Sequence, residues 1–546
     1  MTTNTRRAFL IDPQTRERPG GPVAAMGAKA YNLARLAAIG LPVPHAFVLG
    51  TGFSPADDAQ DAEAQAELNH VLTSQLRRLE RATGLTYGGS RRPLLLSVRS
   101  GAAVSMPGTT STILNVGLNE TALRGLLRTT GNPRLTWDSY RRLVQSFAEV
   151  VDGCPPQAFD ALLDEHLERN RVARPQELDA RSLSKLVRES LALYRKLVGK
   201  NFPQDPMEQL RAAVQGVYRS WSGVGAGTVL RMNSPADAAG TAVIVQRMAF
   251  GNAGGTSGSG VAYTRDPGSG ERRLSMDFMF NAQGEDVVSG RHAVVDADQL
   301  CGILPTIARK VTDVARALEA EFRDMQEFEF TVQDEVLYIL QTRPGQRTMR
   351  AELKIAADQV RESLIEAADA LARVARVEPD ALEHARLAPD TGYAVLCTAT
   401  SAGAGLAIGS IALDADKARE LAARGPVILV RRDATAFDVA GLAHAQGLLT
   451  ARGGRASHAA VAARELDKVV LVGCSELDVD LATRTCRIGE TLLEEGALVC
   501  LDGNSGHVIG GRPELTVDRP EADIAEMERW RKLASRTAAR GKARAG

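Results

Sequence analysis

The sequence predicts an α/β protein built from several domains. A chain of 546 residues is long enough to form several domains, each with its own core. In residues 391–512, short apolar runs that suit buried strands recur at Val427–Val430, Gly447–Thr450 and Val469–Val472. Residues 346–390 are rich in Ala with helical periodicity, so we expect helices that link two domains.

The composition excludes several classes of protein. The 66 basic and 66 acidic residues give a formal net charge of zero, so no global basic field indicates nucleic-acid binding. No run approaches the length of a membrane span, and the first residues lack the apolar core of a signal peptide. The six cysteines are scattered without CxxC spacing, which is typical of reduced thiols. We therefore expect a cytoplasmic protein without a membrane partner.

The first informative segment is residues 26–36, where apolar residues at helical spacing follow a Gly-x-Lys start. Gly40 and Pro42 are expected to end this helix. Lys29 enters the helix and is a candidate phosphate ligand, although a solvated lysine would show the same pattern.

A β-rich run follows in residues 93–117. It is expected to deliver Arg99 to a turn at Ser100-Gly101, before a loop at residues 106–108. Arginine suits bidentate phosphate binding, and a surface arginine on an edge strand is the alternative.

Residues 251–260 form a Gly-rich stretch between two apolar segments, at residues 243–248 and 261–264. We interpret the three pieces as a β-hairpin whose backbone N–H groups can close over phosphates, with Thr256 as a side-chain ligand. The stretch lacks G-K-[ST] and is not followed by a helix, so it is neither a Walker motif nor a dinucleotide fingerprint. A Gly/Ser linker is the alternative, which the flanking apolar strands oppose.

Paired polar residues occur on two later strands. Glu327 and Glu329 share one face of a strand because side chains alternate, and Gln341 and Arg343 do the same on a second strand. Paired carboxylates beside a phosphate-binding arginine could hold Mg²⁺ between phosphates. Two exposed acids on an edge strand would look similar.

The clearest candidate for chemistry is His458. The strand at residues 447–451 precedes a Gly453-Gly454 breaker, and Ser457 is a good N-cap for a helix that begins with small residues. His458 then lies in the first helical turn, where free N–H groups favour a bound anion. It could accept a phosphoryl group; a capping or packing histidine is the alternative.

These segments resemble the pyruvate phosphate dikinase family. Residues 450–464 resemble its phosphohistidine motif T-A-x-G-G-x-T-S-H-A-A-V-x-A-R, with Ala456 in place of a threonine. Residues 98–117 resemble V-R-S-G-A-x-x-S-M-P-G-M-M-D-T-x-L-N-x-G. Residues 327–331 and 340–343 resemble D-I-E-F-T and L-Q-T-R, with Glu in place of the first Asp.

The resemblance extends over residues 20–515 and implies an order of domains. An ATP-grasp-like nucleotide-binding domain would occupy residues 1–345 and a helical linker residues 346–390. A swivelling α/β phosphohistidine domain would occupy residues 391–512, before a basic helical tail at 513–546.

The family chemistry implies a covalent relay. His458 would attack the β-phosphorus of ATP, giving AMP and a pyrophosphorylated histidine, and inorganic phosphate would then take the outer phosphoryl group. The residues that the resemblance assigns to ATP and its phosphates are Lys29, Arg99, Arg142, Thr256, Gln341 and Arg343. Arg142 enters this set through the family's D-S-Y-R-R segment. Glu327 and Glu329 would hold Mg²⁺.

Three hypotheses follow for the acceptor. We expect no room in this chain for the (β/α)₈ barrel that binds pyruvate or phosphoenolpyruvate in the family. A separate barrel subunit would then hold pyruvate or another small molecule. The second hypothesis is a different acceptor, as in proteins resembling phenylphosphate synthase or rifampicin phosphotransferase. The third is a non-catalytic nucleotide-sensing regulatory protein, which the near-complete motif set opposes. A homodimer is compatible with each.

Overall fold

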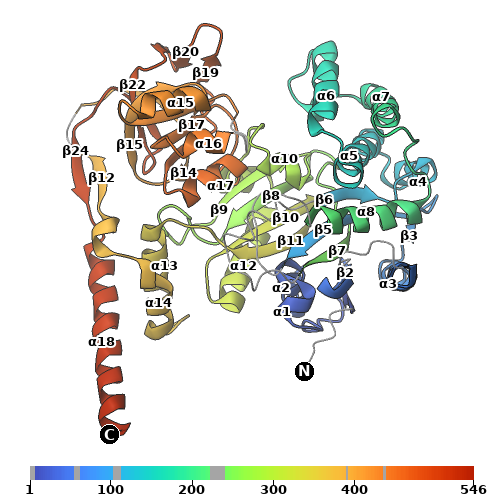
Figure 1. The fold of residues 1–546 in the computed structure, drawn as a ribbon, viewed down its shortest axis with the longest axis horizontal. Coiled ribbons are helices and arrows are strands. Elements are labelled where there is room, and N and C mark those ends of the chain that lie inside the picture. Colours follow the sequence, from blue (N-terminus) through green and yellow to red (C-terminus); the bar gives the residue numbers. More distant parts are fainter. Residues whose placement is uncertain are drawn as a thin grey trace. The chain divides into compact units, whose positions relative to one another are not determined.

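The computed structural model describes residues 7–53, 62–102, 112–221, 240–388, 392–433 and 438–545. The chain divides into two compact units. Unit 1 comprises residues 1–258, 280–282 and 330–343, and unit 2 comprises residues 259–279, 283–329 and 344–546. The mixed α/β class is confirmed (Figure 1), whereas the bounds of the four predicted segments stay a prediction.

Unit 1 is built around an antiparallel five-stranded sheet with the order β1-β2-β7-β5-β6. Its strands are β1 (Ala8–Ile11), β2 (Ala46–Leu49), β5 (Leu96–Ala102), β6 (Thr112–Val116) and β7 (Thr241–Arg247), and β3 (Thr86–Tyr87) and β4 (Pro93–Leu94) form a separate pair. The helices are α1 (Val23–Met26), α2 (Ala28–Ala38), α3 (Ala62–Thr83), α4 (Glu120–Thr130), α5 (Pro133–Asp152), α6 (Pro156–Asn170), α7 (Ala180–Val198) and α8 (Pro206–Trp221).

Helices α5 and α8 pack on this sheet and close its core. The start of α5 follows from its sequence, because Asn132 accepts the N–H of Leu135 at 3.0 Å and Pro133 occupies the first turn. Gly153, with φ of 69°, ends the helix. The core includes buried Phe47 and Phe147.

Two local expectations in unit 1 are wrong. Strand β5 continues through Ser100 and Gly101, so Arg99 lies within a strand rather than before a turn. The Gly-rich stretch does not close a hairpin, because β7 and β8 (Gly258–Tyr263) belong to different sheets. Both edges of β7 are already paired, with β2 and β5, which leaves no edge for β8. The loop expected at residues 106–108 lies outside the described residues.

A four-stranded sheet has the order β11-β10-β8-β9, with β9 at Ser275–Phe280, β10 at Gln326–Gln333 and β11 at Val336–Pro344. The two strands predicted to carry the polar pairs are therefore β10 and β11, and they are neighbours. The helices in this region are α10 (Gly284–Val288), α11 (Ala297–Ile303) and α12 (Pro305–Phe322).

The largest sheet lies in unit 2 and has the order β13-β23-β22-β15-β16-β17-β18-β14. Its central strands β15 to β18 are parallel, and the remaining pairs are antiparallel. The strands are β13 (Val395–Thr398), β14 (Thr400–Gly403), β15 (Leu406–Ala412), β16 (Val427–Arg431), β17 (Gly447–Thr450), β18 (Val469–Val472), β22 (Leu498–Asp502) and β23 (His507–Gly510). The helices are α15 (Ala415–Ala422), α16 (Val439–Leu442) and α17 (His458–Glu465). The predicted strands β17 and β18 have the predicted bounds.

The linker and the tail contain both helices and strands. Helices α13 (Met349–Arg361) and α14 (Ala367–Arg373) lie in the segment predicted to be helical, but β12 (His384–Leu387) then pairs with β24 (Leu515–Asp518). Their role as a linker between domains stays a prediction. Helix α18 (Glu521–Ala545) packs on α13 and α14 through Ile524, Met527 and Trp530. The meander β19 (Leu477–Asp480), β20 (Thr485–Ile488) and β21 (Thr491–Glu494) was not predicted.

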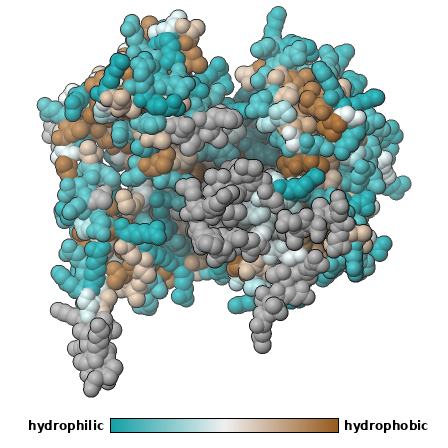
Figure 2. Space-filling view, in the orientation of Figure 1, coloured by the Kyte–Doolittle hydropathy of each residue, from teal (hydrophilic) through white to brown (hydrophobic). Residues whose placement is uncertain are grey.

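On the face shown in Figure 2, hydrophobic patches are separated by hydrophilic side chains. Among the described helices, none combines the length and apolar character needed to cross a bilayer.

Candidate functional site

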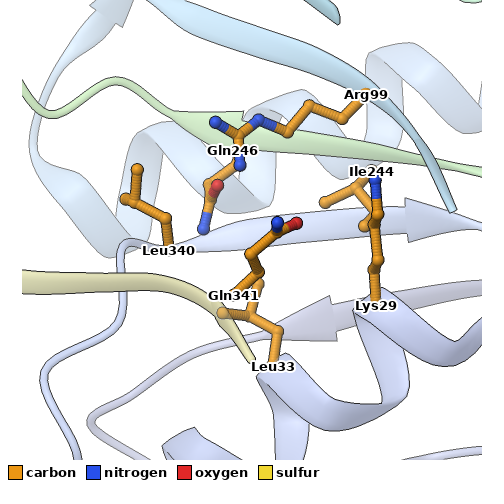
Figure 3. A pocket seen from close by; sticks show the side chains of 7 residues that line it. All are labelled: Lys29, Leu33, Arg99, Ile244, Gln246, Leu340 and Gln341. Atoms are coloured by element: carbon orange, nitrogen blue, oxygen red, sulfur yellow. The ribbon is translucent and has the colours of Figure 1, made fainter. Parts of the chain in front are cut away.

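A small pocket lies in unit 1 between α2 and strands β5, β7 and β11 (Figure 3). It contains three of the predicted ATP ligands, Lys29, Arg99 and Gln341. The other residues that line it are Leu33, Ile244, Gln246 and Leu340. Two cationic side chains and two amides among apolar neighbours suit an anionic ligand with an apolar part.

The start of α2 explains why Lys29 reaches this pocket. Gly27 precedes the helix with φ of 76°, and a Cβ atom there would lie 1.7 Å from the carbonyl oxygen of Gly101 in β5. Only glycine lets α2 begin this close to β5. The Gly-x-Lys start therefore places Lys29 next to the strand that carries Arg99.

Strand β11 is joined to α2 and to the segment that follows this helix by two hydrogen bonds within unit 1. The Asn32 side chain donates to the carbonyl oxygen of Thr342 at 3.3 Å, and the Ile339 N–H donates to that of Pro42 at 2.8 Å. These bonds place Gln341 in the same pocket as Lys29. Arg343 shares a strand face with Gln341 but does not line the pocket.

Gln246 is a pocket residue that sequence reasoning missed. It is buried in β7, and its Nε2 atom has no hydrogen-bond partner within the described residues. In Figure 3 its amide points toward the same space as the polar ends of Arg99 and Gln341. The signal available in the sequence was a polar amide side chain within an apolar strand, between Ile244 and Met248.

Two further predicted ATP ligands, Arg142 and Thr256, do not line the pocket. Arg142 donates to Asp138 at 2.9 Å in a buried ion pair that also includes Arg141, and Asn252 of the Gly-rich stretch donates to the same carboxylate at 2.7 Å. Burial alone would raise the pKa of Asp138, but these arginines and Arg134 hold it well below its usual range. Asp138, which Arg142 pairs with inside α5, thus joins this helix to the Gly-rich stretch. Thr256 is exposed in that stretch.

The carboxylates Glu327 and Glu329 occupy one face of β10, as predicted. Glu327 is buried and Glu329 is half-buried. No cluster of three or more metal-binding side chains occurs in the described parts of the chain. Two hard oxygen donors fit Mg²⁺ of the kind that takes its remaining ligands from water and substrate phosphates.

His458 is the first residue of α17 and is exposed. The Ser457 side chain accepts the N–H of Ala460 at 3.4 Å, which confirms the predicted N-cap. The residues that follow, Ala459 and Ala460, are buried. The imidazole is therefore accessible at a helix N-terminus, where the backbone favours a phosphoryl group.

The turn before His458 is hydrogen-bonded to β9 and to the segment that follows it, at residues that belong to unit 2. Ala456 N–H donates to Asp277 of β9 at 2.6 Å, and the Gly453 N–H donates to the carbonyl oxygen of His292 at 3.2 Å. A Cβ on Gly454 would lie 2.4 Å from the same Asp277 carboxylate, so glycine is required there. Burial raises the pKa of Asp277, although Arg455 and the Ala456 N–H act in the opposite direction.

A second contact joins α17 to the sheet that contains β9. Arg464 of α17 donates to the Tyr263 hydroxyl at 3.0 Å, and its guanidinium lies 5.2 Å from the centre of the Tyr263 ring. No sequence pattern pointed to Asp277 or Tyr263, because they lie 179 and 201 residues before their partners.

Comparison with known proteins gives matches over most of the chain. The family model "Pyruvate phosphate dikinase, AMP/ATP-binding domain" matches residues 54–302 and 293–364, and "PEP-utilising enzyme, mobile domain" matches residues 423–506. Pyruvate, phosphate dikinase of Clostridium symbiosum is 39% identical over 504 residues, which are 92% of this chain and 57% of the relative. The chloroplastic pyruvate, phosphate dikinase 1 of Arabidopsis thaliana is 37% identical over 528 residues, 96% of this chain and 55% of the relative. The chain thus spans a little over half the length of these relatives.

Proposed function

Because the chain belongs to the pyruvate phosphate dikinase family, we propose that it binds ATP in the unit 1 pocket and passes a phosphoryl group through His458. The observation that carries the proposal is the convergence of Lys29, Arg99 and Gln341 from three distant segments into one pocket. Two cations there would offset the charge of the ATP phosphates.

The proposed relay has two steps. A nitrogen of His458 attacks the β-phosphorus of ATP, the bond between that phosphorus and the bridging oxygen to the α-phosphate breaks, and AMP leaves. Inorganic phosphate then attacks the outer phosphorus of the pyrophosphorylated histidine, so that pyrophosphate leaves and one phosphoryl group stays on His458. The N–H groups at the start of α17 support the negative charge in both steps.

Glu327 and Glu329 are proposed to hold Mg²⁺, which would neutralise phosphate charge when it is bound. Their two carboxylates lie on one strand face, and β10 is the neighbour of the strand that carries Gln341. Arg343, two residues beyond Gln341, is proposed as a further phosphate ligand. Arg142 and Thr256 are proposed to act with the Gly-rich stretch rather than in the pocket itself.

The acceptor is proposed to be pyruvate or another small molecule, bound outside the two matched domains; a separate barrel subunit is one place for it. The exposed position of His458 supports transfer to a second site. Affinity capture with the phosphorylated chain, followed by identification of retained proteins and assay with pyruvate, tests this part on its own.

The central test compares His458→Ala with His444→Ala. His444 is a matched control because it is also exposed and lies just before β17, the strand that His458 follows. With ATP labelled at the β position, we expect acid-labile label on the wild type and on His444→Ala but not on His458→Ala, which should still bind ATP. Label from the γ position should leave as pyrophosphate when inorganic phosphate is added. Retained γ label with release of ADP would indicate a simple kinase relay. ATP binding without any label on the wild type would favour a nucleotide-sensing protein.

A further inference from the structure

Two cysteines outside the proposed reaction lie in contact within the eight-stranded sheet. The Sγ atoms of Cys397, in β13, and Cys474, just after β18, are 3.0 Å apart. A disulfide needs an Sγ–Sγ distance of about 2.05 Å, so a movement of about 1 Å would close the bond. Both side chains are buried in the same core cluster.

The backbone of Cys474 is fixed by a hydrogen bond within the sheet, whereas Cys397 lies in an edge strand. The Cys474 N–H donates to the carbonyl oxygen of Thr450, the last residue of β17, at 2.9 Å. Cys397 lies in β13, at the edge of the sheet, next to an irregularity in its pairing with β23. Irregular edge strands open more readily than central strands, so this edge gives a small oxidant access to the pair.

The pair is also chemically asymmetric. The Cys397 and Cys474 side chains share a thiol hydrogen bond, and the backbone N–H groups of Glu476 and Leu477 also donate to the Cys474 sulfur. These bonds lower the pKa of Cys474 against the effect of burial, and the same contact raises the pKa of Cys397. Because the thiolate is the form that oxidants attack, Cys474 is suited to react first.

We propose that Cys397 and Cys474 are a redox-sensitive pair that hydrogen peroxide converts to a disulfide and a dithiol reopens. The Cys474 thiolate attacks one peroxide oxygen, an S–O bond forms, the O–O bond breaks, and the departing hydroxide takes a proton to become water. The Cys397 sulfur then attacks the Cys474 sulfur, the S–S bond forms, and the S–O bond breaks. The second hydroxide takes the Cys397 proton and leaves as water. Two thiols lose two electrons and one peroxide gains them.

The position of the pair connects it to the turn before His458. Gly473, between β18 and Cys474, has φ of 68°, and a Cβ on it would lie 3.1 Å from the carbonyl oxygen of Gly453. The disulfide would therefore fix a segment that packs on this turn. It would also tie the edge strand β13 to the sheet, so the oxidised protein should unfold at a higher temperature than the reduced one.

The test uses the full chain, treated with a small excess of hydrogen peroxide and then denatured for thiol titration. The wild type should fall from six free thiols to four, because one disulfide joins two of the six. Peptide mapping should find the Cys397 and Cys474 peptides linked and lighter by two hydrogen atoms, and dithiothreitol should restore both.

Two variants sharpen the test. Cys397→Ser should give no linked peptide and should leave a sulfenic acid on Cys474 that a cyclic diketone traps. Cys500→Ser removes another buried cysteine of the same sheet and should still lose two thiols and show the link. Six thiols retained by the treated wild type, or a link between other cysteines, would overturn the proposal even where a variant folds poorly.

Discussion

The backbone N–H of Ala456 donates a 2.6 Å hydrogen bond to the carboxylate of Asp277, a residue 179 positions earlier in the chain. Ala456 lies two residues before His458, in the turn that sets the start of α17. A buried carboxylate on β9 therefore helps to position the residue that we propose carries phosphate.

We predict that Asp277→Asn stabilises the protein at neutral pH. The pKa of Asp277 is raised in the folded state, chiefly by burial, so its contribution is favourable below its ordinary value of 3.8 and is lost as pH rises through the folded pKa. Asparagine keeps an acceptor for Ala456 without the buried charge. Thermal unfolding at a series of pH values should show the gap between variant and wild type shrinking toward pH ~4. A gap that does not change with pH would contradict this account.

The contribution of Asp138 to stability depends on pH in the opposite direction. Its pKa is held well below the usual range because Arg142, Arg141 and Arg134 outweigh the effect of burial. Its stabilising contribution is therefore present above the unfolded pKa of about 4 and is lost only in strong acid. Asp138→Ala should lower the free energy of unfolding at neutral pH by about 3–5 kcal/mol, since it leaves buried guanidinium groups uncompensated. Denaturant titration measures this loss, and exposed Asp313→Ala should be near neutral.

The start of α17 was predictable because its determinants are adjacent in the sequence. Gly453, Gly454 and Ser457 lie within a few residues of His458, and each acts on its own local backbone. The same holds for α2, where Gly27 precedes Lys29 by two positions. Caps and breakers of this kind act on the neighbouring backbone and do not depend on tertiary contacts.

The failures concern contacts between distant segments. Apolar strands on both sides of the Gly-rich stretch suggested a hairpin, yet β7 pairs with β2 and β5, whose positions the local pattern does not encode. The pairing of β12 with β24 was missed for the same reason. In the candidate site, Gln246 carried no motif but lines the pocket with residues from distant segments. The role of Arg142, which carries a family motif and lies in an ion pair with Asp138 inside α5, stays a prediction.

The Ser457 cap provides a local test of the His458 turn. Ser457→Ala removes the acceptor for the Ala460 N–H and should destabilise the protein by about 1 kcal/mol. Ser457→Thr should retain most of the cap. Ser535→Ala, on the exposed face of α18, serves as a control and should leave the unfolding midpoint unchanged. Equal midpoints for Ser457→Ala and wild type would show that the cap contributes nothing.

Glu329→Gln tests the proposed Mg²⁺ site. We expect phosphoenzyme formation to slow by at least about 10²-fold, because a preorganised charge contact of this kind is typically worth about 3 kcal/mol. Excess Mg²⁺ should recover part of the rate if the carboxylate binds the ion. Glu335→Gln, at an exposed position between β10 and β11, is the matched control. A labelling time course that is the same for both variants would show that the Glu329 carboxylate takes no part in forming the phosphoenzyme.

The last prediction concerns Gln246, whose Nε2 atom lacks a hydrogen-bond partner in the described structure. If that amide binds the nucleotide, Gln246→Leu should weaken ATP binding about tenfold, the equivalent of one hydrogen bond of ~1.4 kcal/mol. Stability should not fall, because the variant replaces a buried side chain whose Nε2 atom is unpaired by an apolar group of similar size. Calorimetric titration with ATP and thermal unfolding measure the two effects separately.

Gln209→Leu is the matched control, because that buried amide accepts from the Gly117 N–H at 2.9 Å and donates to the carbonyl oxygens of Leu118 and Pro203 at 3.1 and 2.8 Å. It does not line the pocket. Its replacement leaves a buried N–H and two carbonyl groups without their partner, so stability should fall while ATP affinity is kept. Gln246 has a structural role instead if its variant loses stability as Gln209→Leu does and binds ATP as the wild type does.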